Sequence, residues 1–182
     1  MRKIVSGLFM SLDGVVEAPQ TWHFPYFNDE MGAIVQAQID ASDTLLLGRV
    51  TYDEFVQFWP NAGTDVELAD HMNNSRKVVV STTLGEPTWQ NTEVIRDDVA
   101  DRIGALKSEP GKDIGITGSP TLVRWLLNND LLDELNLLVH PIVVGSGKRL
   151  FTENNDRKGL TLAKSETLKT GVLSLTYRPA GI

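Results

Sequence analysis

The sequence contains no cysteine. Disulfide bonds, thiolate nucleophiles and cysteine-ligated metal sites are therefore excluded. Histidine is also scarce, with three residues that lie far apart in the sequence, at positions 23, 71 and 140. They do not have the spacing of a zinc site, so we expect no metal in the functional site.

The charge and hydrophobicity of the chain disfavour two further classes of protein. The formal net charge is −7, whereas sequence-independent binding to nucleic acid depends on many lysine or arginine contacts to phosphates. No apolar run approaches the roughly 20 residues that span a bilayer. The first residues are basic and then apolar, but the apolar part is short and Asp13 follows it, so we interpret it as a strand rather than a signal peptide. We expect a cytoplasmic protein that binds neither nucleic acid nor membrane.

The order of the predicted elements indicates the fold class. Predicted strands and helices alternate through most of the chain, which is typical of a parallel sheet. Near the C-terminus, two segments of alternating residues, Leu160–Leu168 and Val172–Arg178, flank a turn and predict an antiparallel hairpin. Because 182 residues can bury a sizeable core without covalent links, we predict a single α/β domain over residues 1–182. Its sheet is mostly parallel, with the hairpin at one edge.

The most informative motif follows the apolar run Leu45–Leu47. Gly48 ends this predicted strand, and Arg49 and Thr51 open a helix directly after it. Backbone N–H groups, the positive end of a helix dipole and a guanidinium then lie together, as an anionic cofactor requires. The ordinary alternative is a tight turn with a surface arginine. We interpret the motif as a phosphate-binding turn.

Three other predicted strands are followed by glycine or hydroxyl residues. Arg76 and Lys77 begin one of them and Ser81 and Thr82 end it; a hydroxyl pair with an arginine nearby suits the ribose phosphate of NADP. No G-x-G-x-x-G opens the first helix, so a dinucleotide site would be assembled from separate turns at the carboxyl ends of the strands. The candidate cofactor-binding residues are Gly48, Arg49, Thr51, Ser81, Thr82, Thr117, Gly118, Ser119, Gly145 and Gly147.

The candidate residues for chemistry at the substrate come from the first thirty residues and from Trp59. Asp13 follows the first strand and Glu30 begins the next predicted helix, so either could supply or orient a proton. Their ordinary alternatives are a turn aspartate and a first-turn helix carboxylate. Trp22, Tyr26 and Trp59 are candidate walls for a flat ring.

Taken together, the motifs resemble one family. The chain is similar to the reductase domain of bacterial riboflavin-biosynthesis deaminase-reductases, in its free-standing dihydrofolate-reductase-like branch. This resemblance covers nearly the whole chain and rests on motifs in the expected order: Ser11–Gly14, Leu47–Tyr52, Lys77–Ser81, Thr117–Leu122, Leu131–Leu135 and His140–Gly147. It implies a dihydrofolate-reductase-like three-layer α/β/α fold, NADPH as hydride donor and a homodimer formed through the C-terminal strands.

The resemblance also implies roles for individual residues. It assigns Gly48, Arg49 and Thr51 to a phosphate turn, and Asp13 to the substrate side. Ser81 and Thr82 then lie near the adenosine ribose, and Gly118 and Ser119 form the pyrophosphate turn. The implied activity is NADPH-dependent reduction of a small heterocycle or ribosylamino-pyrimidine, as in 5-amino-6-(5-phosphoribosylamino)uracil reductase.

One motif of the riboflavin reductases is not present. They carry T-x-x-x-D-x-P, whereas here Thr51 is followed by Tyr52-Asp53-Glu54-Phe55. Two alternatives to the riboflavin-type activity remain open. One is a dihydrofolate or pterin reductase, and the other is a non-catalytic protein that binds a nucleotide or pterin.

Overall fold

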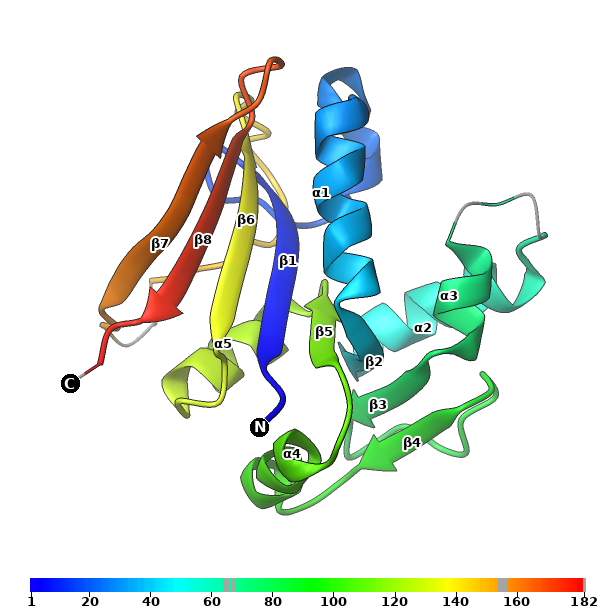
Figure 1. Cartoon of the computed structure of the whole chain (residues 1–182). Helices are drawn as coiled ribbons and strands as arrows, with labels where there is room; N and C mark the ends of the chain where they lie inside the picture. The colour runs from blue at the N-terminus through cyan, green and yellow to red at the C-terminus, as the bar shows by residue number, and fades with distance from the viewer. Residues whose placement is uncertain (64–65, 67, 154–156, 182) are drawn as a thin grey trace.

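A computed structural model describes residues 1–63, 66, 68–153 and 157–181 of the chain. The described strands form one sheet with the order β4-β3-β2-β5-β1-β6-β8-β7. The first six strands run parallel, and β8 and β7 are antiparallel at one edge (Figure 1). The predicted mostly parallel sheet with an antiparallel C-terminal hairpin is therefore confirmed. The strands are β1 (Ile4–Ser11), β2 (Ser42–Gly48), β3 (Arg76–Val80), β4 (Thr92–Ile95), β5 (Asp113–Thr117), β6 (Glu134–His140), β7 (Leu160–Thr167) and β8 (Leu173–Pro179).

Helices cover both faces of the sheet, which gives three layers. On one face, α4 (Val99–Ser108) and α5 (Pro120–Asn128) pack their leucines and Ile103 on a core that includes Ile4, Leu46 and Ile114. On the other face lie α1 (Asp29–Asp40), α2 (Arg49–Phe58) and α3 (Ala69–Asn74). Three short 3₁₀ helices, η1 (Pro19–Thr21), η2 (Phe24–Tyr26) and η3 (Trp59–Asn61), lie in the connections.

Local sequence explains where two of these helices begin. The Asn28 side chain accepts a hydrogen bond from the Met31 N–H at 3.0 Å and so caps α1. Pro120 is the first residue of α5, where its missing N–H leaves no hydrogen bond unmade. Among the described residues, no helix is long and apolar enough to cross a membrane. They also contain no group of three or more side chains that could hold a metal ion.

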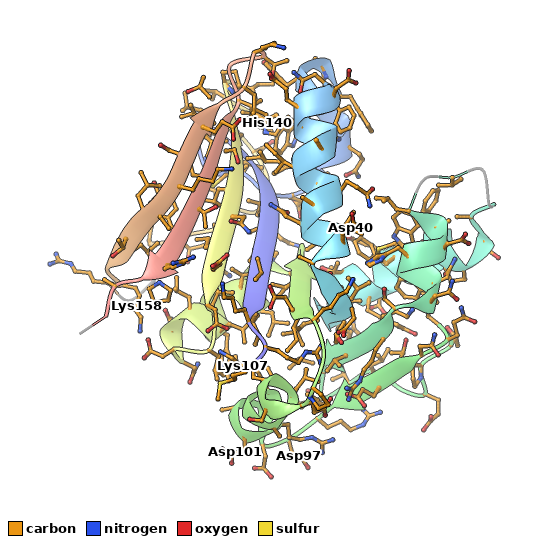
Figure 2. The ribbon with its side chains drawn as sticks, viewed as in Figure 1. Asp40, Asp97, Asp101, Lys107, His140 and Lys158 are labelled. Atoms are coloured by element: carbon orange, nitrogen blue, oxygen red, sulfur yellow. The ribbon has the colours of Figure 1, made fainter. Side chains whose placement is uncertain are left out.

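The register of the parallel strands brings their carboxyl ends to the same edge of the sheet. Gly48 pairs with Val80, and Val80 pairs with Ile95. On the other side of β5, Thr117 pairs with Gly7 of β1, and Ser11 pairs with His140. The turns that follow β1 to β6 therefore lie along this carboxyl edge, where open α/β sheets bind ligands. His140 marks the end of β6 at this edge (Figure 2).

Candidate functional site

Two predicted turns are joined by direct hydrogen bonds at the carboxyl edge. The Gly48 N–H donates to the Ser119 hydroxyl at 2.8 Å, and that hydroxyl donates to the Thr51 hydroxyl at 2.6 Å. Thr51 and Ser119 are both buried. The start of α2 and the start of α5 are thus held together by one serine, although 68 residues separate Ser119 from Thr51.

Glycines make this close contact possible. A Cβ atom on Gly48 would lie 3.0 Å from the Ser119 Oγ. Gly118 has a φ of +75°, and its Cβ would lie 3.1 Å from the Thr51 Cγ2. Larger residues at these positions would push the two turns apart, and at Gly118 they would also strain the backbone.

The contact brings two helix N-termini to one place. No side chain caps α2 at Gly48 or α5 at Ser119, so the first-turn N–H groups of both helices are available to an anion. The Arg49 guanidinium lies at the start of α2, half-exposed, and its Nε is 3.6 Å from the Asp53 carboxylate. This part of the edge has the backbone donors and the positive charge that a pyrophosphate requires.

The turn after β3 forms a second part of the edge. The Ser81 hydroxyl accepts hydrogen bonds from the Thr83 N–H at 3.2 Å and the Leu84 N–H at 3.0 Å, while Thr82 is exposed beside it. Arg96 follows β4, and its guanidinium donates to the carbonyls of Leu84 and Gly85. A hydroxyl pair and an arginine therefore lie next to each other at this corner.

The arginine at this corner is not one that the sequence analysis singled out. Arg76 and Lys77 begin β3, so they lie at the opposite edge of the sheet. Arg76 pairs with Glu93 and Glu109, and the buried Lys77 ammonium donates to three carbonyls at the end of α3. Arg96 could have been found because it follows a parallel strand, as Ser81 does.

The Asp13 carboxylate is hydrogen-bonded to a loop and is not free to contact a ligand with both oxygens. Its carboxylate accepts hydrogen bonds from the Ser11 hydroxyl at 2.7 Å, the Val144 N–H at 3.0 Å and the Gly145 N–H at 2.9 Å. These bonds, that of Ser11 first, hold the pKa of Asp13 well below its ordinary value. Gly147, with a φ of +120°, lies in the loop after β6, and a Cβ there would be 2.9 Å from Val15 in the loop after β1. Gly145 and Gly147 thus lie at the carboxyl edge, tied to the end of β1.

Glu30 also makes contacts that keep it ionised. Its carboxylate accepts from the Lys169 N–H at 2.9 Å and from the Asn28 amide at 3.2 Å. The Lys169 N–H is the main reason why the pKa of Glu30 lies below its ordinary value. Neither Glu30 nor Asp13 is thus in the protonated state that a general acid needs near neutral pH.

The three aromatic candidates lie in two different places. Trp22 and Tyr26 surround the buried His140 ring, with centroid distances of 5.2 Å and 5.6 Å in edge-on geometry. Trp22 is itself buried and donates from its indole nitrogen to the Glu17 carbonyl. Trp59 instead lines a cavity on the face of the sheet that carries α1 and α2. The structure does not bring the three rings together around one ligand.

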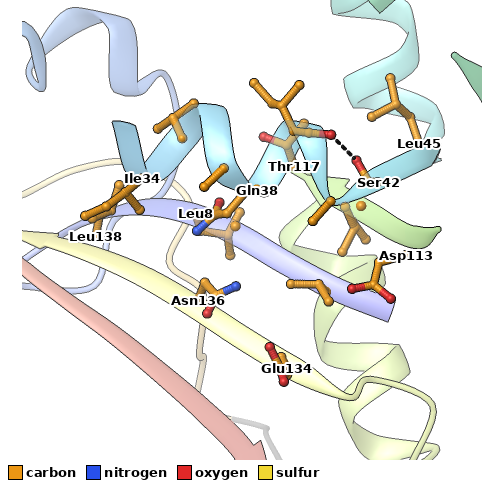
Figure 3. Close-up of a pocket in the computed structure, with 18 of the residues that line it drawn as sticks. Leu8, Ile34, Gln38, Ser42, Leu45, Asp113, Thr117, Glu134, Asn136 and Leu138 are labelled. Carbon is orange, nitrogen blue, oxygen red and sulfur yellow. Dashed lines mark hydrogen bonds between the residues drawn. The ribbon is translucent and has the colours of Figure 1, made fainter. Parts of the chain in front are cut away.

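This cavity has a volume of about 580 Å³. Its floor is formed by β1, β5 and β6, and Figure 3 shows Ile34 and Gln38 of α1 on one side, facing Asn136 and Leu138 of β6. Phe55 and Trp59 contribute from α2 and η3. Thr117 also lines the cavity and directly precedes Gly118, so the cavity lies next to the turns at the carboxyl edge.

Comparison with known proteins relates the chain to one family over nearly its whole length. The profile of the RibD C-terminal domain family matches residues 2–174. An uncharacterised relative, YyaP of Bacillus subtilis (strain 168), is 31% identical over 182 residues, which cover 97% of this chain and 94% of YyaP.

Solved structures share the fold at low sequence identity. A candidate riboflavin biosynthesis protein of Shewanella sp. PV-4 has a TM-score of 0.77 at 22% identity, and all of both chains is covered. A diaminohydroxyphosphoribosylaminopyrimidine deaminase/5-amino-6-(5-phosphoribosylamino)uracil reductase of Thermotoga maritima has a TM-score of 0.69 at 12% identity. That comparison covers 98% of this chain and 57% of the Thermotoga chain.

The family match extends over almost the whole chain, and the sheet has the topology that the resemblance implied. The dihydrofolate-reductase-like fold and the resemblance to riboflavin-biosynthesis reductase domains are both confirmed. The chain belongs to the RibD C-terminal domain family, a family of reductase domains.

Proposed function

We propose that this chain is a reductase that takes NADPH as its hydride donor and a small heterocycle as its substrate. The observation that carries the proposal is the contact between the β2–α2 and β5–α5 turns, through Gly48, Thr51 and Ser119, beside a cavity of about 580 Å³. A dinucleotide site and a substrate site must adjoin for hydride transfer, and the proposal is supported by the position of Thr117, which lines the cavity and directly precedes the Gly118 turn. Family membership and the reductase name of the Thermotoga protein support the same reaction class.

The residues at the carboxyl edge fit a phosphorylated dinucleotide. A Cβ on Gly48 would press on the Ser119 side chain, and one on Gly118 would press on Thr51, so the bare glycines let the two turns lie close enough to act on one phosphate group. The first-turn N–H groups of α2 and α5 would hold the pyrophosphate, with Arg49 adding charge. Ser81, Thr82 and Arg96 would hold the ribose phosphate. When bound, NADPH supplies a hydride to an electrophilic carbon.

The chain's own residues then position the substrate and exclude water. Phe55 and Trp59 form an apolar wall beside Thr117. Asp13 and Glu30 stay ionised through their hydrogen bonds, so we propose that the proton comes from solvent and that the two carboxylates position the surrounding loops. Their catalytic assignment from the sequence becomes a positioning role in this proposal.

The cofactor assignment is tested by titrating the purified protein with NADPH and NADH. The double substitution Arg49→Ala and Ser81→Ala removes a charge and a hydroxyl beside the proposed phosphates, so NADPH affinity should fall by at least about tenfold. The affinity for NADH should fall less, because NADH shares the pyrophosphate proposed to lie beside Arg49 but lacks the ribose phosphate proposed to lie beside Ser81. Arg102→Ala on α4, an exposed arginine paired with Asp97, is the matched control. If neither NADPH nor NADH binds at millimolar concentration, the proposal is rejected.

Two alternatives from the sequence analysis are separated by activity. Dihydrofolate reduction would appear as NADPH oxidation with dihydrofolate that antifolates inhibit. The contacts of Glu30 with Asn28 and Lys169 argue against it, because this carboxylate does not face the cavity as a free partner for a pterin. A binding protein without turnover would bind NADPH and a heterocycle but show no hydride transfer in the wild type.

A further inference from the structure

We propose that the cavity takes an uncharged, flat heterocycle with a lactam edge and excludes substrates that carry a phosphate. This inference rests on the proposed function, since it names the substrate class of the same site. It depends on three properties of the cavity: its apolar walls, its charges and the side-chain amides of Gln38 and Asn136.

Apolar side chains form the walls on the α2 side. The Phe55 and Trp59 rings meet edge-on, with centroids 6.3 Å apart and an angle of 82° between their planes. Leu45, Leu68 and Met72 continue this wall across β2 and α3. Aromatic faces and aliphatic side chains favour the binding of a flat ring, because the ring buries its apolar surface against them.

The charges around the cavity do not suit a phosphate. Two carboxylates, Asp113 and Glu134, lie among its lining residues, and Glu134 is paired with Lys3 and Arg178. Among the described lining residues, Lys164 is the only lysine or arginine. Its ammonium is largely exposed and lies 3.4 Å from the Glu166 carboxylate. A phosphate moved from water into this environment would lose its hydration without gaining a free cation.

His71 does not change this conclusion. It lies among the lining residues, and its Nε2 is 3.3 Å from the Ser75 hydroxyl. Burial lowers the pKa of His71, so the ring is neutral near pH 7. The charges of Arg49 and Arg96 lie outside the cavity lining, at the carboxyl edge.

Two side-chain amides give the cavity its polar recognition groups. Gln38 of α1 extends across the floor, where a Cβ on Gly7 would lie 2.4 Å from its Oε1; Gly7 therefore leaves the room that Gln38 uses. Asn136 of β6 accepts a hydrogen bond from the Thr176 hydroxyl at 2.7 Å through its oxygen. The Gln38 amide and the Asn136 amide nitrogen have no other hydrogen-bond partner among the described residues, and both line the cavity (Figure 3). Such groups match the C=O and N–H of a lactam.

Riboflavin and its 5′-phosphate, FMN, provide a matched pair of probes. Both carry the same flat ring with a lactam edge and the same ribityl chain, and they differ in one phosphate. Binding is followed by the quenching of flavin fluorescence, without NADPH. We expect riboflavin to bind at least about tenfold more tightly than FMN, since only FMN must place a dianion beside the cavity. Equal or tighter binding of FMN, or no binding of riboflavin at millimolar protein, would overturn the inference.

Two glutamines on α1 separate recognition from a general effect on the helix. Gln38→Ala should weaken riboflavin binding by about tenfold, the loss of roughly one to two hydrogen bonds. Gln36→Ala is the control, because Gln36 bonds to Asp40 on the exposed side of the same helix and should leave binding unchanged. Equal losses in the two variants would contradict the assignment. Thermal unfolding of both variants, followed by circular dichroism, establishes that each is folded.

The cofactor titration keeps this inference distinct from the proposed function. Gln38→Ala should bind NADPH as the wild type does, because Gln38 lies on α1 and not at the carboxyl edge. If NADPH binds and FMN is preferred over riboflavin, the inference fails and the proposed function stands. If riboflavin binds preferentially and NADPH does not bind, the proposed function fails and the assignment of the cavity stands.

Discussion

Two hydroxyl groups at the carboxyl edge, those of Ser119 and Ser81, are held by hydrogen bonds to backbone and side-chain groups of the turns. Ser119 accepts a hydrogen bond from the Gly48 N–H and donates one to Thr51, so its hydroxyl is used in both directions. Ser81 accepts two backbone N–H groups in its own turn. The hydroxyls that the sequence marks as ligand-binding residues therefore also fix the turns that carry them.

Gly118 offers a direct test at this scale. We predict that Gly118→Ala destabilises the fold by about 1–2 kcal/mol, because alanine is disfavoured at positive φ. The new methyl would also meet Thr51 at 3.1 Å, so NADPH affinity should fall. Urea unfolding and cofactor titration measure the two effects.

A second glycine provides the control for this substitution. Gly104 lies inside α4, and a Cβ there would meet nothing within 4 Å. Gly104→Ala should therefore raise the free energy of unfolding by about 0.5–1 kcal/mol. If both substitutions had the same sign, the argument from backbone conformation and close contact at Gly118 would be wrong.

At the scale of elements, loops are attached to strands and helices that are distant in the sequence. Asp13 binds the backbone of the loop after β6, and the Arg149 guanidinium donates back to the Asp13 carbonyl at 2.9 Å. Arg124 of α5 donates to the carbonyls of Arg149 and Leu150. The glycine-containing loop after β6 is thereby fixed to β1 on one side and to α5 on the other.

The Asp13 contacts predict a specific dependence of stability on pH. Because the folded-state pKa of Asp13 is lowered, the ionised carboxylate stabilises the fold above its ordinary pKa, near 4. That contribution is lost as the pH falls below about 4. Asp13→Asn should therefore be less stable than the wild type at pH 7, and the difference should narrow from pH 4 to pH 3.

Chemical denaturation at pH 7, 4 and 3 measures this difference. Asp97→Asn serves as the control, because Asp97 is highly exposed and lies 3.9 Å from Arg102. It should be close to the wild type at each pH. A constant deficit of the Asp13 variant across the three pH values would show that its carboxylate charge is not what holds the loop.

The elements were more predictable from the sequence than the contacts between them. Apolar runs such as Leu45–Leu47 and Ile114–Thr117 indicate strands because their burial follows from composition. The position of the glycine and hydroxyl turns follows from the parallel order of these strands. By contrast, the contact of Asp13 with Val144 spans 131 residues, and no local pattern encodes it.

Tertiary contacts also explain why the surroundings of single residues at the candidate site do not follow from the sequence. Asp13 and Glu30 have the residue type of a proton donor, but tertiary hydrogen bonds from Gly145 and Lys169 decide their state. Trp22 is a suitable wall for a ring in composition, yet it is buried against His140. Gln38 gave no signal in the sequence, because its availability depends on Gly7 in a different strand.

At one edge of the sheet, the hairpin formed by β7 and β8 is exposed. β7 is the outermost strand, most of its residues are exposed, and Leu162 is 49% exposed. Such an edge is a ready surface for pairing with another chain. We propose that the chain forms the homodimer that the family resemblance implies, through β7 and β8.

Sedimentation equilibrium tests this assembly over a range of protein concentrations. The wild type should sediment as a dimer, and Leu162→Lys should shift it toward the monomer, because a buried interface would then contain an unpaired charge. Arg102→Ala, on the helix α4 away from the hairpin, should sediment as the wild type does. A wild-type monomer at every concentration would contradict the proposal.

The bond between Glu30 and the backbone of Lys169 has a mechanical consequence. Glu30 lies in the first turn of α1, and Lys169 lies in the turn between β7 and β8. The helix that forms one side of the cavity is thus fastened to the tip of the hairpin. A displacement of the hairpin would be transmitted through this bond to α1 at the wall of the cavity, so the proposed assembly through β7 and β8 would be mechanically coupled to the proposed substrate site.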